Sequence, residues 1–138
     1  CDWSSDVCSS DLVESSARST RDLQFNAERA GVQIRTVHMN VEDWLPSVDR
    51  PVDLVVADPP RSGLGAKVTS ELVRIKPARL VLVSCDPSTL ARDLAALQAG
   101  GFEMERLTLV DMFPQTYHIE SVAELAARQP AAGAGTQP

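Results

Sequence analysis

Apolar runs and helical patterns alternate along the chain. The continuous apolar runs at 52–58 (VDLVVAD) and 78–84 (ARLVLVS) are typical of strands buried on both faces of a parallel sheet. Residues 17–31, 66–76 and 87–101 instead carry their apolar positions at helical spacing. Strands that alternate with helices of about ten to fifteen residues predict βαβ units. We therefore expect an α/β fold with a parallel sheet.

Three further segments extend this pattern. Residues 32–39 (VQIRTVHM) alternate as a strand does, and we expect Val32 and Ile34 to point inward. Residues 102–113 predict a longer strand. By period alone, residues 118–128 (HIESVAELAAR) fit a strand or a helix.

Both ends differ from the rest in composition. Residues 1–12 (CDWSSDVCSSDL) are rich in Ser, Asp and Cys, show neither hydrophobic period, and resemble the conceptual translation of a sequencing adapter. We therefore expect 1–12 to be a non-native leader and 13–127 to be the native part. Residues 128–138 are rich in Ala, Gly and Pro, which predicts a disordered tail.

Charge and cysteine content restrict the chemistry. The 138 residues carry a formal net charge of −6, and removing the three aspartates of the leader leaves −3, so any basic face for nucleic acid must be local. Removing the leader also reduces three cysteines to one, which excludes a disulfide or a cysteine zinc site in the remainder. No secretion signal or membrane-spanning run is evident, so we expect a cytoplasmic protein.

Four polar residues follow expected strands: Glu14, Asn40, Asp58 and Cys85. In open α/β sheets ligands bind beyond the carboxyl ends of the strands, so we expect these residues to face one crevice. Each also has a simpler explanation. Asp58 could begin a turn, Glu14 could be a solvated carboxylate, Asn40 could cap the next helical turn, and Cys85 could be a small buried hydrophobe. The pattern alone predicts a ligand-binding α/β domain.

Three ordered motifs make the prediction more specific. Residues 58–65 (DPPRSGLG), 83–94 (VSCDPSTLARDL) and 111–121 (DMFPQTYHIES) resemble the C-terminal signatures of the RNA uracil-5 methyltransferases. These enzymes depend on S-adenosyl-L-methionine and have a Rossmann-like class I catalytic domain. The resemblance extends over residues 13–125. It implies an enzyme that methylates carbon 5 of a uridine in tRNA or rRNA, with RNA as partner and no metal in this segment.

The resemblance also implies catalytic roles. Cys85 is implied to be the nucleophile that adds to carbon 6 of uracil and makes carbon 5 electron-rich. A helix that begins after the cysteine favours the thiolate in general. Glu120 is implied to be the general base that removes the carbon-5 proton after methyl transfer. Asp86 stands where the family most often has Asn, and its negative charge beside the thiol opposes ionisation.

Further residues are implied to hold ligands. Glu14 is expected to bind the ribose hydroxyls of the cofactor and Asn40 to lie near its adenine. Asp58 is expected to lie between the cofactor and the target base. His118 could orient the base or merely pack, and Arg61 could contact RNA phosphate or form a salt bridge on its loop.

The family's domain begins with a strand that ends in a glycine-rich cofactor loop, and no Gly-x-Gly precedes Glu14. We therefore expect an incomplete Rossmann-like sheet without that strand, leaving two buried strand edges unpaired. The chain would then be the C-terminal part of a catalytic domain. Two alternatives remain: an inactive fragment without independent cofactor binding, and an amino-group methyltransferase of the DPP type, which would not require Cys85. A nicotinamide-dependent Rossmann enzyme predicts a glycine-rich fingerprint before Glu14, which the sequence lacks.

Overall fold

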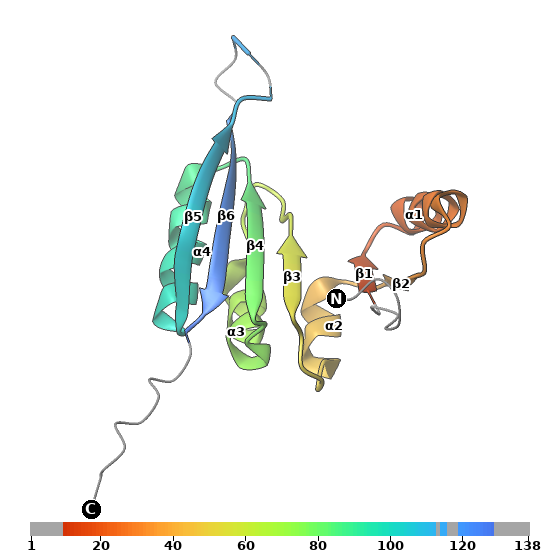
Figure 1. Cartoon of the computed structure of the whole chain (residues 1–138), viewed down its shortest axis with the longest axis horizontal. Helices are drawn as coiled ribbons and strands as arrows, with labels where there is room; N and C mark the ends of the chain where they lie inside the picture. Colours follow the sequence, from red (N-terminus) through yellow and green to blue (C-terminus); the bar gives the residue numbers. More distant parts are fainter. Residues whose placement is uncertain (1–9, 113, 116–118, 129–138) are drawn as a thin grey trace, which may run out of the picture. The chain divides into compact units, whose positions relative to one another are not determined.

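The computed structural model describes residues 10–112, 114–115 and 119–128 (Figure 1). The chain divides into two compact units, Cys1–Val48 and Asp49–Pro138, and each is described by itself. The elements, in chain order, are β1 (Ser10–Glu14), α1 (Ala17–Ala30), β2 (Ile34–His38), α2 (Val41–Trp44), a 3-10 turn η1 (Leu45–Ser47), β3 (Leu54–Ala57), α3 (Gly65–Ile75), β4 (Arg79–Ser84), α4 (Pro87–Ala99), β5 (Phe102–Val110) and β6 (Glu120–Ala127).

The first unit contains a two-stranded parallel sheet and the helix that connects its strands. β1 pairs with β2 from Ser10 opposite Ile34 to Glu14 opposite His38. α1 begins after Ser16, whose side chain accepts a hydrogen bond from the Ser19 N–H. The helix ends at Gly31, whose φ of 65° is the left-handed conformation that glycine adopts without strain. The helix expected over 17–31 is confirmed.

β1 begins inside the segment expected to be a leader. Asp11 accepts two hydrogen bonds from the guanidinium of Arg35 on β2, at 2.7 and 2.8 Å, and its side chain is only 7% exposed. This hydrogen bond and the charge of Asp11 raise the pKa of Arg35. Residues 10–12 therefore contribute to the pairing of the first unit. Residues 1–9 of the expected leader and 129–138 of the expected tail lie outside the described residues.

The second unit contains a four-stranded mixed sheet with the strand order β3-β4-β6-β5. β3 is parallel to β4, whereas β6 is antiparallel to both β4 and β5. The segment 118–128, ambiguous by period, therefore forms a strand from Glu120 onward. α3 and α4 lie on the same face of this sheet (Figure 1). The parallel sheet expected from the sequence is thus completed by an antiparallel hairpin.

The core of the second unit lies between the sheet and these two helices. Side chains alternate along β4 and β6, so every second residue faces the helices and is buried. The apolar side chains with at most 2% exposure in the described residues are Leu72, Pro77, Leu80, Leu82, Leu97, Phe102, Ala123 and Leu125. Val81 and Val83, on the other face of β4, are only half-buried.

The expectation that β3 is buried on both faces is wrong. Leu54 and Val56 are 53% and 65% exposed, because they lie on the face of the sheet opposite α3 and α4. Val32 is 50% exposed and does not belong to a strand. Its N–H instead donates to the Ala27 carbonyl oxygen at the end of α1, so it forms part of the helix cap.

Each sheet has an unpaired edge within the described residues. β3 pairs with β4 alone, and β1 pairs with β2 alone. Parallel sheets in α/β proteins are normally covered on both faces, whereas β3 has one partner strand and exposes Leu54 and Val56 on one face. The expectation of an incomplete α/β sheet is therefore confirmed.

Replacing Leu82 by alanine should destabilise the chain, because its side chain is 1% exposed and packs between sheet and helices. We expect Leu82→Ala to lower the free energy of unfolding by about 2 to 5 kcal/mol, measured by urea denaturation. Leu109→Ala is the matched control, since Leu109 is 65% exposed on β5. Equal losses in the two variants would contradict this description of the core.

Candidate active site

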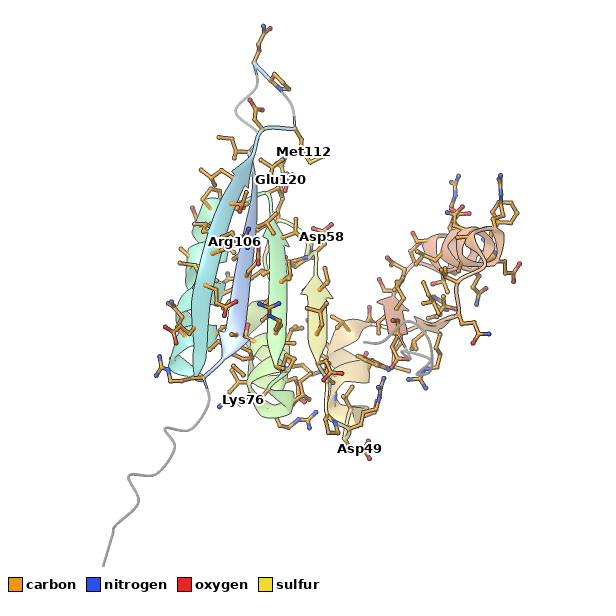
Figure 2. All side chains as sticks on the ribbon, in the orientation of Figure 1. Asp49, Asp58, Lys76, Arg106, Met112 and Glu120 are labelled. Carbon is orange, nitrogen blue, oxygen red and sulfur yellow. The ribbon has the colours of Figure 1, made fainter. Side chains whose placement is uncertain are left out.

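Three of the expected site residues lie at the same end of the strands of the four-stranded sheet. Asp58 directly follows β3 and Cys85 directly follows β4, which are parallel. Glu120 is the first residue of β6, and because β6 is antiparallel to β4 it begins where β4 ends. Figure 2 shows Asp58 and Glu120 at this end, with Lys76 at the opposite end.

Cys85 and Glu120 lie next to the last pair of the β4–β6 ladder. This pair is Ser84 opposite Ser121, so Cys85 is the residue after it on one strand and Glu120 is the residue before it on the other. Opposed residues in an antiparallel pair have Cα atoms about 4.5 to 5.5 Å apart. Ser84 and Ser121 are buried on the helix side, so the alternation places Glu120, and Cys85 if continued by one residue, on the other face.

The backbone around Cys85 is held by the hydroxyl of Ser84. This oxygen donates to the Asp86 carbonyl oxygen at 3.1 Å and accepts from the Asp86 N–H at 3.2 Å. The two hydrogen bonds join the residues on either side of Cys85 and fix the turn from β4 into α4. Cys85 is a free, half-buried cysteine at the centre of this turn.

Asp86 is the N-cap of α4, and Pro87 occupies the first helical turn. Its Oδ1 accepts hydrogen bonds from the N–H groups of Ser88 and Thr89, both at 2.9 Å. The hydrogen bond from the Thr89 N–H, together with the smaller effects of Ser88, the Thr89 hydroxyl and the charge of Arg61, lowers the pKa of Asp86. Asn is also among the preferred N-cap residues, so Asp86 keeps a capping side chain at the position where the family most often has Asn.

Arg61 and Asp58 belong to the loop that connects β3 to α3. Both are exposed, and the charge of Arg61 acts on the Asp86 carboxylate. The Arg61 carbonyl oxygen also accepts a hydrogen bond from the hydroxyl of Thr89 on α4, at 3.1 Å. The loop with Asp58 and the helix after Cys85 are therefore in direct contact.

Glu14 and Asn40 lie together in the first unit, at the carboxyl ends of β1 and β2. The Glu14 carbonyl oxygen accepts from the N–H of Met39, which precedes Asn40. Glu14 Oε1 accepts from the Ser16 N–H at 2.7 Å, as a carboxylate at a helix entrance does. Asn40 is the N-cap residue of α2, but its side chain makes no capping hydrogen bond. The crevice expected to join all four strand-end residues remains a prediction, because these two belong to the other unit.

Two further residues near the site, Asp93 and Ser84, were not predicted from the sequence. Asp93 lies three residues after Leu90 and four before Leu97, on the apolar face of α4, and it is 3% exposed. A charged residue on an apolar helix face is the signal that could have identified it. Ser84 carries no comparable signal. His118 lies outside the described residues.

Within residues 10–112, 114–115 and 119–128, no group of three or more His, Cys, Asp or Glu side chains is arranged to hold a metal ion. In the same part of the chain, no helix combines the length and the apolar character needed to cross a membrane.

Comparison with protein families identifies one that spans most of the second unit. The family described as tRNA (uracil-5-)-methyltransferase matches residues 45–128. An uncharacterized RNA methyltransferase of Thermotoga maritima is 43% identical over 114 residues, which are 82% of this chain and 26% of that protein. One of Aquifex aeolicus, with the same description, is 53% identical over 77 residues, 56% of this chain and 18% of that protein. The chain thus spans about a quarter or less of these relatives' length.

Solved structures show the same fold. The Pyrococcus abyssi tRNA (uracil-54, C5)-methyltransferase in complex with S-adenosyl-L-homocysteine matches with a TM-score of 0.73 and 30% identity, over 86% of this chain and 29% of that one. NSun6 from Pyrococcus horikoshii, solved with SFG, matches with a TM-score of 0.71 over 87% of this chain and 41% of that one. At 14% identity, the second match shows the Rossmann-like fold alone.

The capping role of Asp86 predicts a specific dependence of stability on pH. Because folding lowers its pKa below the ordinary value of 3.8, its ionised form stabilises α4 at neutral pH, and this is lost as the pH falls through the lowered pKa. We expect wild type to melt above Asp86→Asn at pH 7, and this difference to be smaller at an acidic pH below the ordinary value of 3.8. Asp86→Ala should melt below Asp86→Asn at both values, and a constant difference between wild type and Asp86→Asn would refute the explanation.

Proposed function

The chain belongs to the tRNA (uracil-5-)-methyltransferase family, and on that premise we propose that it carries the catalytic groups for methylating carbon 5 of a uridine in tRNA or rRNA. The complete gene product that contains residues 10–128 performs the reaction, in the cytoplasm where these RNAs are processed. The observation that carries the proposal is the β4–β6 ladder, whose last pair, Ser84 opposite Ser121, is flanked by Cys85 and Glu120 at the end of the sheet where Asp58 follows β3.

Cys85 provides the first covalent step. Carbon 5 of uracil is a poor nucleophile, but addition of the Cys85 thiolate to carbon 6 forms a sulfur–carbon bond and moves the electron pair of the ring double bond toward carbon 5 and the carbonyl oxygen at carbon 4. The resulting enolate is nucleophilic at carbon 5. Cys85 is a free, half-buried cysteine that directly precedes Asp86, the N-cap residue of α4.

Glu120 completes the reaction as the general base. After carbon 5 has received the methyl group, it still carries a proton that must leave before the enzyme can be released. The Glu120 carboxylate takes this proton, the freed electron pair restores the ring double bond, and the bond between carbon 6 and the Cys85 sulfur breaks. The base must therefore reach carbon 5 while the nucleophile is bonded to carbon 6, and the position of Glu120 and Cys85 at the same end of β6 and β4 supports that arrangement.

The loop after β3 contributes contacts to the substrate. The Asp58 carboxylate, exposed at the same edge, accepts a hydrogen bond from the ring N–H of uracil and also approaches the cofactor. Arg61 is exposed beside it and contacts an RNA phosphate.

The polar side chains at the strand ends of the first unit fit S-adenosyl-L-methionine. A carboxylate has about four lone-pair sites, so Glu14 can accept hydrogen bonds from ribose hydroxyls while its Oε1 keeps the bond from the Ser16 N–H. The Asn40 side chain, which makes no capping hydrogen bond, can contact the adenine. When bound, this cofactor supplies an electrophilic methyl group. The Pyrococcus abyssi relative in complex with S-adenosyl-L-homocysteine supports the assignment.

The covalent role of Cys85 can be tested with RNA that traps the adduct. Fluorine at carbon 5 cannot be removed as a proton, so wild-type gene product incubated with S-adenosyl-L-methionine and 5-fluorouridine-containing tRNA or rRNA transcripts should form a complex that survives denaturing electrophoresis. Cys85→Ser should form none, because the hydroxyl is a far weaker nucleophile. An adduct in Cys85→Ser would contradict the mechanism, and an amino-group methyltransferase would form no adduct even as wild type.

The role of Glu120 predicts that a variant without this base accumulates the covalent complex on ordinary RNA. Glu120→Gln keeps the nucleophile but removes the base, so we expect it to accumulate a covalent complex on unmodified tRNA or rRNA and to release methylated product about 100-fold more slowly. Rapid-quench measurement of adduct and product follows both species. Glu124→Gln is the matched control, because Glu124 lies on the same strand and pairs with Arg106. Normal turnover in Glu120→Gln would exclude Glu120 as the base.

A further inference from the structure

The buried carboxylate of Asp93 has partners on two elements. Its Oδ2 accepts a hydrogen bond from the N–H of Leu64 at 2.7 Å, and Leu64 ends the loop that begins with Asp58. Its Oδ1 accepts from the Arg92 guanidinium, at 3.1 Å from Nε and 2.9 Å from Nη2. The Asp93 side chain is only 3% exposed, so this carboxylate is satisfied by protein groups rather than left to water.

Asp93 is one of three α4 side chains that bind the backbone of this loop. The Thr89 hydroxyl lies 3.1 Å from the Arg61 carbonyl oxygen and 3.2 Å from the Asp86 carbonyl oxygen, and its one hydrogen is shared between them. Arg92 Nη2 donates to the Ser62 carbonyl oxygen at 2.8 Å, and Asp93 Oδ2 accepts from the Leu64 N–H at 2.7 Å. We call these three residues the α4 clamp. The clamp lies within the first two turns of the helix that starts directly after Cys85 and Asp86.

Gly63 shows how closely the loop approaches the clamp. A Cβ atom added at this position would clash with Asp93 Oδ2 and would lie 2.6 Å from Arg92 Nη2. The φ of Gly63, 78°, is also in the region that favours glycine. The loop backbone is therefore seated against the two charged side chains without room for a side chain of its own.

A charged residue is unusual at position 93, on the buried face of α4. Leu90 and Leu97, on the same face of α4, are buried, and an apolar side chain at position 93 would pack there without the cost of burying a charge. What a carboxylate adds is direction, because it fixes the Leu64 N–H with a short charge-assisted hydrogen bond. The clamp thus determines where the loop lies relative to α4.

We propose that Asp93, with Thr89 and Arg92, is a positioning residue that locks the loop bearing Asp58 to the helix that follows Cys85. Asp58 and Cys85 each lie one residue beyond a strand, so the strand ladder does not by itself fix their separation. The clamp supplies the missing constraint. This inference rests on the proposed function, in which the Cys85 nucleophile and the Asp58 carboxylate act on one uracil.

The first test measures the clamp without any reaction. In the complete gene product, Asp93→Asn should raise the hydrogen-exchange rate of the loop amides, Leu64 above all, by about tenfold, while amides in β4 and β6 change less than about threefold. Glu71→Gln is the matched control, because it removes an ion pair with Arg74 on α3, away from the loop. Unchanged exchange at Leu64, or an equal rise across the whole sheet, would overturn the proposal.

The second test measures the consequence for chemistry. With 5-fluorouridine-containing transcripts, Asp93→Asn should form the Cys85 adduct about tenfold more slowly per folded molecule, and the milder Thr89→Val about threefold more slowly. Full adduct rates in variants whose loop exchanges faster would refute a positioning role. If wild type itself forms no adduct, the proposed function fails, and the exchange rate of Leu64 alone decides whether the clamp holds the loop.

Discussion

Strand β4 is hydrogen-bonded along both edges, in parallel to β3 and antiparallel to β6, and the arrangement of the candidate site follows from these two ladders. Its helix-facing side chains, Leu80 and Leu82, are at most 1% exposed, so the core fixes which face each residue of β4 occupies. A shift of one residue would move these leucines to the open face and move the site residues with them. Core packing and site geometry therefore depend on the same register.

The antiparallel course of β6 explains how distant parts of the sequence meet. A purely parallel sheet would bring only carboxyl ends of strands to this edge, whereas β6 contributes its first residue, Glu120. The edge thus combines Asp58 after β3, Cys85 after β4 and Glu120 from β6. Around them, the hydrogen bond from the Ser84 hydroxyl to the Asp86 carbonyl oxygen and the one that the Asp86 carboxylate accepts from the Ser88 N–H hold the turn at Cys85. The α4 clamp holds the loop after Asp58. The reactive side chains themselves are left to face a substrate.

Much of this fold could be predicted from local patterns. Neighbouring residues were enough to predict the helices over 17–31 and 87–101. The first ends at a glycine cap, and the second begins with Asp-Pro. Burial was harder to predict, since Leu54 and Val56 read as core although their face of the sheet carries neither α3 nor α4. The period of 118–128 did not separate strand from helix, because pairing with β4 and β5 decides that, and pairing is not local. The strand-end residues were predictable from the sequence. The α4 clamp was not, because it depends on the contact between Leu64 and Asp93, which are 29 positions apart.

The central claim is that the β4–β6 register sets Cys85 against Glu120, and disulfide trapping tests it most directly. At the Cα separation of opposed antiparallel residues, about 4.5 to 5.5 Å, two cysteines can form a disulfide. On mild oxidation, Glu120→Cys should therefore link to Cys85, identified by peptide mass spectrometry, whereas Glu124→Cys on the same strand should not. Efficient linkage at 124 and none at 120 would contradict the register, and with it the proposed pairing of nucleophile and base.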